Sequence, residues 1–380
     1  MKIAHINYIP NDNILGVEKK IKNQSKAALN LGLDIDFIIL NSNIDKIENN
    51  LKLIKLKSSQ NNFISKIQKK LFKFSLISRS VDLNEYDYII LRYPSMDFSA
   101  LSFSRKWGDK IITEHHTDEI GEMNSEEINL TIKFKIFLEK IIGPKFLRNI
   151  RGLIAVTDEI RKVELLKANK NIYSSVISNG ISIKDVEFTQ FTKFDNKELK
   201  LIFVASYFAP WHGLDLLLKS LKDYKDYFDI KLYLIGDLSN ELKDLIKNID
   251  NNKVNIKILG RKYGEELNYY FKKSNIAISS LALHRNNMKE ACVLKTREYI
   301  ARGIPFVYRY DDSDLIGDNN FSLKLSIQDE IDIRVILDFV IKLKEIDNIS
   351  EIERDFALEY LDWQIKVKKM YEFVKVLSNV

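Results

Sequence analysis

Two glutamates, Glu290 and Glu298, are separated by seven residues in a stretch that combines a loop, a helix and a strand. The residues after Glu290 are small and apolar, and those around Glu298 have a helical pattern that ends at Gly303. Unpaired N–H groups at the start of such a helix attract anions, phosphates above all. A nucleotide could bind here with its diphosphate on these groups and its hydroxyls on both acids. Two acids at this spacing also arise by chance in a highly charged chain, and Glu298 would then be a solvated helix residue.

The elements that position these acids alternate between apolar strands and amphipathic helices. Such alternation predicts an α/β fold with helices on both faces of a parallel sheet. The pattern restarts after a polar passage at 182–197, which we interpret as a domain boundary. We therefore expect two doubly wound Rossmann-like domains, ligand-binding residues at the carboxyl ends of their strands, and a site in the cleft between the domains. The predicted strands are 2–9, 34–40, 88–93, 110–114, 152–156, 173–177, 199–205, 230–235, 254–259, 276–280 and 306–310.

Candidate site residues stand where the strands of the first half end. Gly16 precedes a helix without a GxGxxG pattern, which argues against a hydride-transferring enzyme. A single glycine still lets the backbone approach a phosphate, although it could equally be a turn glycine. His115 and His116, two of five histidines, follow the strand at 110–114 and indicate contact with a polar ligand, or else a loop pair without a role. No second cluster at ligand spacing accompanies them, so we expect no metal site.

Further candidates follow the strands of the second half. His212 and Gly213 stand directly before a predicted helix, which gives a second helix N-terminus at the same edge of the sheet. Arg261, Lys295 and Arg297 could neutralise a diphosphate. A single cation of this kind is more often a surface charge. Because all three are expected near the ends of strands, we favour a role for the set in binding a diphosphate.

Composition limits the classes of protein that the chain can belong to. The net charge of +6 over 380 residues is too small to indicate a nucleic-acid-binding protein. Cys292 is the single cysteine, so a disulfide framework and a cysteine zinc site are excluded, and a reducing cytoplasm is expected. The N-terminus has the pattern of a strand rather than a signal peptide. No apolar run reaches the roughly 20 residues that span a bilayer.

Nearly the whole chain resembles a GT-B-fold retaining glycosyltransferase of family 4, the glycosyltransferase group 1 type. The resemblance implies an acceptor-binding domain at 1–185, a nucleotide-sugar-binding domain at 198–355 and a C-terminal helix at 356–380 that packs back on the first domain. The motifs that carry it are the Gly16 loop, IITEHH, IAVTDEIRK, VISNGI, APWHG, LYLIG, ILGRKYGEEL, the two glutamates followed by EYIARGIPFV, and Trp363.

The resemblance implies transfer of a sugar from a nucleotide-diphosphate donor to an acceptor hydroxyl with retention of anomeric configuration. Glu298 would hold the ribose, and Glu290 would contact the donor sugar. The backbone N–H groups of Cys292, Val293 and Leu294 would bind the diphosphate. Either His115 or His116 would lie near the sugar and the acceptor. No metal or other cofactor is implied, because positive side chains and helix termini would stabilise the leaving diphosphate.

The sequence departs from this family at two places. The family commonly has an arginine and a lysine in the turn where this chain reads SYFAPWHG, with His212 at the position of the lysine. The diphosphate would then depend more on Arg261, Lys295 or Arg297. The pair Ala291-Cys292 also replaces residues that are usually glycine-rich or aromatic. These departures concern the identity of the donor more than the fold.

The stretch 49–81 holds eight lysines and arginines and no acid, and 132–151 is similarly basic and apolar. Such a composition suits a helix on an anionic membrane, here the inner face of the plasma membrane with its lipid-linked acceptors, or simply a solvated helix. The expected product is a surface polysaccharide, such as capsule or lipopolysaccharide, or a glycolipid. A nucleotide-sugar epimerase of the same fold and a non-catalytic nucleotide-sugar-binding protein are the alternatives.

Overall fold

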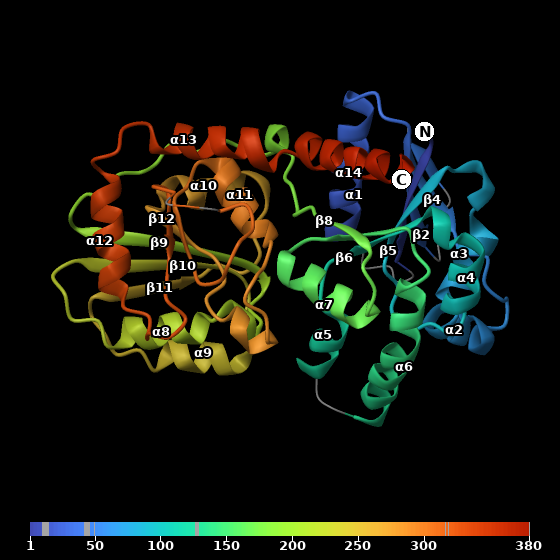
Figure 1. Ribbon diagram of the computed structural model, residues 1–380. Helices are drawn as coiled ribbons and strands as arrows, with labels where there is room; N and C mark the ends of the chain where they lie inside the picture. The colour runs from blue at the N-terminus through green and yellow to red at the C-terminus, as the bar shows by residue number, and fades with distance from the viewer. Residues whose placement is uncertain are drawn as a thin grey trace. The chain divides into compact units, whose positions relative to one another are not determined.

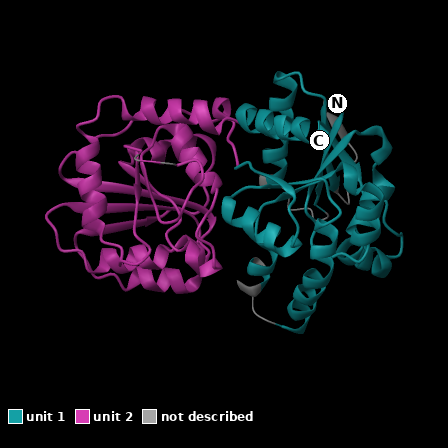
Figure 2. Cartoon of the chain, viewed as in Figure 1, with its two compact units in different colours: residues 1–178, 363–380 teal, residues 179–362 magenta. Residues whose placement is uncertain are grey.

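The computed structural model describes residues 1–9, 15–41, 46–48, 50–125, 129–315, 317 and 319–379. The chain forms two compact units, which Figure 2 shows in different colours. Unit 1 comprises Met1–Ser178 with Trp363–Val380, and unit 2 comprises Asn179–Asp362. The passage at 182–197, which the sequence pattern suggests as a boundary, lies in unit 2, because Ile183 and Phe194 are buried in its core.

Unit 1 is built on an eight-stranded sheet in the order β3-β4-β2-β1-β5-β6-β7-β8. All neighbouring strands are parallel except the pair β3 and β4. The central strand β1 reads IAHINY and is almost entirely buried, as expected for a parallel strand that is covered on both faces. The strands are β1 Ile3–Tyr8, β2 Ile35–Asn41, β3 Lys46–Glu48, β4 Leu51–Lys55, β5 Tyr88–Arg92, β6 Ile111–His115, β7 Gly152–Ala155 and β8 Tyr173–Val176.

Helices pack on both faces of this sheet (Figure 1). The basic stretch at 49–81 contains strand β4 and two short helices rather than one long helix. The helices of unit 1 are α1 Leu15–Asn30, α2 Asn62–Leu71, α3 Lys73–Ser80, α4 Ala100–Trp107, α5 Glu119–Ser125, α6 Leu130–Leu147, α7 Asp158–Ala168 and α14 Trp363–Ser378.

The C-terminal helix α14 belongs to unit 1, the unit that also contains the first part of the chain. One side of this helix carries Trp363, Val367, Met370, Val374 and Leu377, which are all buried in the core of unit 1. Their spacing of three and four residues is that of a single helix face. Helix α14 therefore packs into the same hydrophobic core as α1 and the sheet.

Unit 2 is built on a six-stranded, fully parallel sheet in the order β11-β10-β9-β12-β13-β14. The two parallel sheets with interleaved helices confirm the predicted α/β class with two Rossmann-like halves. Strand β14 is three residues long and was not predicted. The strands are β9 Glu198–Tyr207, β10 Asp229–Asp237, β11 Val254–Ile258, β12 Ile276–Ile278, β13 Phe306–Tyr308 and β14 Ser322–Lys324. The helices are α8 Leu214–Lys222, α9 Asn240–Lys247, α10 Gly264–Lys273, α11 Leu294–Arg302, α12 Ile333–Leu343 and α13 Ile349–Phe356.

Within the described part of the chain, no helix has both the length and the apolar composition needed to cross a bilayer.

Candidate functional site

The candidate site of unit 2 lies where the order of strands reverses. Strand β9 has β10 on one side and β12 on the other, and the chain after β9 forms a 3-10 turn, η4 Pro210–His212. The chain after β12 is hydrogen-bonded to this turn. The N–H of Leu281 donates to the His212 carbonyl at 2.9 Å, and the N–H of Ala282 donates to the Trp211 carbonyl at 3.2 Å. Such switch points are where open α/β sheets bind ligands.

Gly213 connects this turn to helix α8 in a conformation that only glycine adopts easily. Its φ of 71° lies in the left-handed region. A Cβ on Gly213 would lie 2.9 Å from the Cβ of Ala282. Because glycine has no Cβ, η4 and the start of α8 can pack closely against the chain that follows β12.

Helix α11 begins after strand β12 at the same edge, with Glu290 before it and Glu298 in its second turn. No side chain caps this helix, so the N–H groups of Leu294 and Lys295 in its first turn have no partner within it. Glu290 is half-buried in the preceding loop, where it pairs with Asp311 in an isolated parallel bridge. The structure thus gives the loop-and-helix placement of the two acids that the sequence pattern suggests.

The ammonium group of Lys295 is buried and has no hydrogen-bond or ion-pair partner among the described residues. Its Nζ lies 5.0 Å from the ring centroid of Phe203 and 5.6 Å from that of Trp211. Burial lowers the pKa of Lys295 well below its ordinary value. A buried ammonium group without a counter-ion is unfavourable, so an anion bound beside it would be stabilised strongly.

His212 lies in the electrostatic field of the same lysine. Burial, with Lys295 adding to it, lowers the pKa of His212 to about 3, so the imidazole is neutral near pH 7. The N–H of Ala209 donates to Nδ1 at 3.0 Å. A neutral ring that accepts at Nδ1 carries its proton on Nε2, and His212 is therefore a hydrogen-bond donor at that atom. The ring of Trp211 stacks on it at 3.8 Å between centroids.

Arg302 holds the carboxylate of Glu298 through one of its two oxygens. Oε1 accepts from Nε of Arg302 at 3.0 Å and from Nη2 at 2.7 Å. The guanidinium group is fixed in turn, since Nη1 donates to Oδ1 of Asn268 at 2.8 Å and the group lies 4.3 Å from the ring centroid of Phe271. Because both arginine contacts go to Oε1, Oε2 of Glu298 remains able to accept from a ligand hydroxyl.

Two arginines that were expected near an anion are already in ion pairs. Arg297 is completely buried between Asp312 and Asp314, and its Nε donates to the Asn179 carbonyl at 3.3 Å. Its role is therefore structural. Arg261 is half-exposed and forms a 2.6 Å ion pair with Asp237. Lys295 is thus the cation of this set that has no carboxylate beside it in the described structure.

Cys292 and Asn179 attach the loop before α11 to the first residues of unit 2. The N–H of Asn179 donates to Sγ of Cys292 at 2.8 Å, and Nδ2 of Asn179 donates to the Cys292 carbonyl at 3.1 Å. These contacts fix the direction in which the chain enters Val293 and Leu294. Asn179 belongs to the motif VISNGI, but its contact with the cysteine could not be read from the sequence.

In unit 1, a second polar cluster surrounds Glu114 at the carboxyl end of β6. Nε2 of His5 lies 2.8 Å from its Oε2, Nε2 of His116 lies 3.3 Å from the same oxygen, and Nζ of Lys20 lies 3.7 Å from Oε1. Burial opposes ionisation of Glu114, but His116, Lys20 and His5 outweigh it and hold its pKa well below the usual range. Burial, with Lys20 adding to it, lowers the pKa of His116 to about 4. The His116 side chain keeps 13% of its surface exposed.

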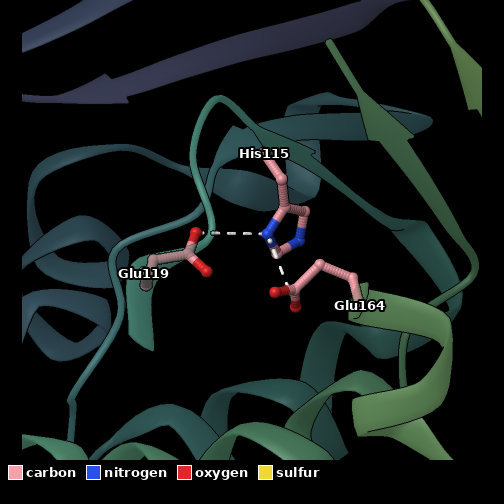
Figure 3. A group of neighbouring side chains, drawn as sticks. All are labelled: His115, Glu119 and Glu164. Carbon is pink, nitrogen blue, oxygen red and sulfur yellow. Dashed lines mark hydrogen bonds and ion pairs between the residues drawn. The ribbon is translucent and has the colours of Figure 1, made fainter. Parts of the chain in front are cut away.

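His115 is turned into a separate, buried cluster and is completely inaccessible to solvent. Figure 3 shows its Nδ1 between two carboxylates, at 3.2 Å from Oε1 of Glu119 and 3.6 Å from Oε2 of Glu164. Burial acts against a charged imidazole, but Glu164 and Glu119 raise the pKa of His115 above its ordinary value. Of the two histidines that the sequence left as alternatives, His116 is therefore the one with access to solvent.

The ligand atoms of His115, Glu119 and Glu164 lie within 4.8 Å of one another, close enough to hold a metal ion. Lys167 already supplies a positive charge there. Its Nζ lies 2.7 Å from Glu139, 3.1 Å from Glu164 and 3.7 Å from Glu119. Burial disfavours its charge, but the three glutamates raise the pKa of Lys167 above its ordinary value. A cation would have to compete with this ammonium group, so we assign the cluster a structural role.

The Gly16 prediction falls at the beginning of α1, where Gly16 is the second residue of the helix. The residues at 10–14 that precede the helix lie outside the described residues.

Sequence reasoning missed the residues that support the candidate side chains. Arg302 had a local signal, since an arginine four residues after a glutamate commonly pairs with it on a helix. Asn268, His5, Lys20 and Glu164 had none, because they come from distant parts of the chain.

Comparison with solved structures identifies the architecture. A glycosyltransferase from Rickettsia africae ESF-5 is similar with a TM-score of 0.69 and 18% identity, over 99% of this chain and 98% of that one. Sucrose-phosphate synthase from Thermosynechococcus elongatus is similar with a TM-score of 0.68 and 13% identity, over 100% and 99%. Anabaena HepE, solved with UDP-glucose, gives 0.60 and 12%, over 100% of both chains. The chain therefore has the GT-B fold.

A family comparison adds a narrower result. Residues 185–310 match the model of the glycosyl transferases group 1 family. This segment lies within unit 2 and contains His212, Lys295, Glu290 and Glu298. The match supports a group 1 glycosyl transferase domain in this part of the chain. No curated protein matched the sequence.

Proposed function

We propose that this protein is a retaining glycosyltransferase of family 4 that transfers a sugar from a nucleotide-diphosphate donor to a hydroxyl of a saccharide or lipid-linked acceptor. Unit 2 would bind the donor. The diphosphate would lie over the N–H groups of Cys292, Val293 and Leu294, together with that of Lys295, and Gly213 would lie at the neighbouring helix start. Glu298 would accept from the ribose, and Glu290 would contact the donor sugar. His212 would donate from Nε2 to the diphosphate or the sugar.

The buried, unpartnered ammonium group of Lys295 is the observation that carries this proposal. It lies at an uncapped helix start, beside the turn where a second helix begins, at a strand switch point of the described structure. Backbone N–H groups and helix termini supply partial positive charge, and Lys295 would supply a full one when an anion is bound. This set of groups matches the two negative charges of a diphosphate.

The chemistry requires stabilisation of a leaving group more than a strong base. As the glycosidic bond to the diphosphate breaks, negative charge accumulates on the phosphate oxygens while the sugar becomes oxocarbenium-like. Fixed donors that are already oriented toward those oxygens lower the barrier, because they need no reorganisation during the reaction. We propose that Lys295 and the helix starts provide this stabilisation without a metal ion.

Unit 1 would bind the acceptor, with His116 as a neutral hydrogen-bonding group held by Glu114. Similar structures include a lipopolysaccharide outer core galactosyltransferase, WaaB, and sucrose-phosphate synthase, which supports a saccharide as the acceptor. We propose a role in surface polysaccharide or glycolipid synthesis at the cytoplasmic side of the membrane.

A direct assay tests the reaction class. The protein would be incubated with labelled UDP-, GDP- and ADP-sugars, after a thermal-shift screen has selected the nucleotide that raises the melting temperature. Nucleotide release that depends on an added acceptor, and that persists in EDTA, supports the proposal. Conversion of the donor sugar without acceptor would indicate an epimerase instead. Binding without either product would indicate a non-catalytic binding protein.

The two glutamates should affect different steps. We expect Glu298→Ala to weaken nucleotide binding about tenfold or more, because a hydrogen bond from a hydroxyl to a charged carboxylate is lost. Glu290→Ala should mainly lower kcat, because the contact is with the reacting sugar. Isothermal titration with the nucleotide and steady-state kinetics separate the two effects. Glu351→Ala, on the exposed side of α13, is the control, and unchanged kinetics in both site variants would remove these two roles.

A further inference from the structure

Helix α2 exposes its apolar face and turns its polar face toward the protein. It has a strongly amphipathic sequence, yet none of its residues is buried. Its inner side makes polar contacts: Oγ of Ser65 lies 3.0 Å from Oγ of Ser58, and Oε1 of Gln68 accepts from the N–H of Ser59 at 2.8 Å. Phe63, Ile64 and Ile67 are exposed, Phe63 by 73%. This is the opposite of the usual orientation of a surface helix, whose apolar side faces the core.

Helix α6 carries a second exposed apolar stripe. Ile132, Leu138, Ile142 and Phe146 on one side are buried in unit 1. The other side exposes four apolar residues at helical spacing, of which the first is 85% and the third 60% exposed. These residues are Leu130, Phe134, Phe137 and Ile141.

Lysines border both stripes, and acids are scarce within these helices. Lys66 and Lys70 are exposed on α2, and Lys133, Lys140 and Lys145 are exposed on α6. Helices α2 and α3 contain no acid, and the one acid of α6, Glu139, is buried beside Lys167. Helix α3, which directly follows α2, packs on α6, since the ring centroids of Phe74 and Phe146 lie 4.8 Å apart.

We propose that the exposed apolar faces of α2 and α6, with their bordering lysines, form a surface that binds an anionic lipid bilayer. Apolar side chains would enter the boundary between headgroups and acyl chains, and the lysines would lie at the level of the anionic headgroups. A second copy of the chain fits less well, because two such faces would bring like charges together. This surface goes beyond the proposed reaction and does not depend on it, since lipid binding requires no donor.

Vesicle co-sedimentation of the full chain tests the surface. The lipids would be phosphatidylcholine alone, or with about one-third phosphatidylglycerol, at about 0.1 M and at about 0.5 M salt. We expect binding to the anionic vesicles that weakens at high salt. Leu130→Ser should weaken it about tenfold or more. Lys133→Gln with Lys140→Gln should weaken it about thirtyfold, since each lysine near such a surface contributes about fivefold.

Matched controls come from unit 1 itself. Leu166 on α7 is 80% exposed, nearly as much as Leu130, and Lys368 and Lys369 are exposed on α14. Leu166→Ser and the double variant Lys368→Gln with Lys369→Gln should bind vesicles like the unchanged protein.

Several results would overturn the proposal. The first is no binding to anionic vesicles at low salt. The second is equal binding to neutral and anionic vesicles. Binding that the α6 variants do not reduce more than the controls do would overturn it as well. The last is a change of oligomeric state in Leu130→Ser, measured by sedimentation velocity without lipid, together with unchanged vesicle binding, which would assign the face to a second copy.

Discussion

Replacing Lys295 by methionine should abolish most of the activity and at the same time make the ligand-free protein more stable. Loss of the ammonium group removes the cation that we place at the leaving diphosphate. Removal of one preorganised group of this kind typically lowers kcat about 100- to 1000-fold. Steady-state kinetics with the nucleotide sugar found by thermal shift measure this effect.

The expected gain in stability also results from removal of the Lys295 ammonium group. In the described structure, Nζ of Lys295 has no hydrogen-bond or ion-pair partner and lies 5.0 Å from the ring centroid of Phe203 and 5.6 Å from that of Trp211. An unsatisfied buried donor costs about 1–3 kcal/mol. Methionine keeps an unbranched apolar side chain against the two rings without the ammonium group, so the melting temperature of Lys295→Met should rise.

The pH dependence of donor binding gives an independent check. Because burial holds the pKa of Lys295 well below its ordinary value, the free protein releases its proton more easily than an exposed lysine does. A bound diphosphate favours the charged form and raises that pKa again. Binding therefore takes up protons between these two pKa values, and donor affinity should fall as pH rises through that window. Titration calorimetry in two buffers of different ionisation enthalpy measures the uptake.

Lys262 provides the matched control for the kinetic, thermal and calorimetric measurements. It lies in the same unit, and its Nζ pairs with Oε1 of Glu266 at 3.1 Å. Lys262→Met should change neither proton uptake nor catalysis appreciably. If Lys295→Met retains full activity, the diphosphate is not held by this lysine and the donor-site assignment is wrong.

The second large effect concerns stability. Lys167→Met should destabilise the protein by about 3–5 kcal/mol, because it leaves buried carboxylates without their counter-charge. Three glutamates, at positions 119, 139 and 164, share this ammonium group. Urea denaturation followed by circular dichroism measures the loss in the free energy of unfolding. Lys162→Met, on the exposed side of the same helix, is the matched control and should cost far less.

The same cluster predicts a pH dependence of stability. Burial raises the pKa of Glu164 to about 7, whereas the unfolded residue titrates near about 4.3. The folded state therefore binds more protons between these values, and this group's contribution to stability falls as pH rises through that range. Glu164→Gln should flatten the dependence between about pH 5 and 7. A variant that keeps the full slope would show that another group is responsible.

Local patterns in the sequence were enough to predict the α/β class and the elements that carry the two acids. The alternation of apolar strands with helices follows from periodicities of two and 3.6 residues, which are visible in the sequence itself. For the same reason, Glu290 was expected in a loop and Glu298 inside the following helix, and both are found there. Strands β3, β4 and β14 escaped prediction because lysines interrupt their short apolar patterns.

The environment of each charged side chain depended on contacts across the fold. Lys295 and Arg297 are two positions apart on α11, yet Arg297 is paired with Asp312 and Asp314 while Lys295 faces aromatic rings. Residues two positions apart on one helix point in different directions, and what each one meets is supplied by other elements.

The sequence by itself determined the fold class and the set of residue types available for binding an anion. Only the tertiary structure distinguished His116, which keeps access to solvent, from His115, which Glu164 and Glu119 enclose. The physical reason is that burial and charge pairing are set by groups distant in the chain, so the pKa and the availability of a side chain follow from packing rather than from its neighbours in sequence.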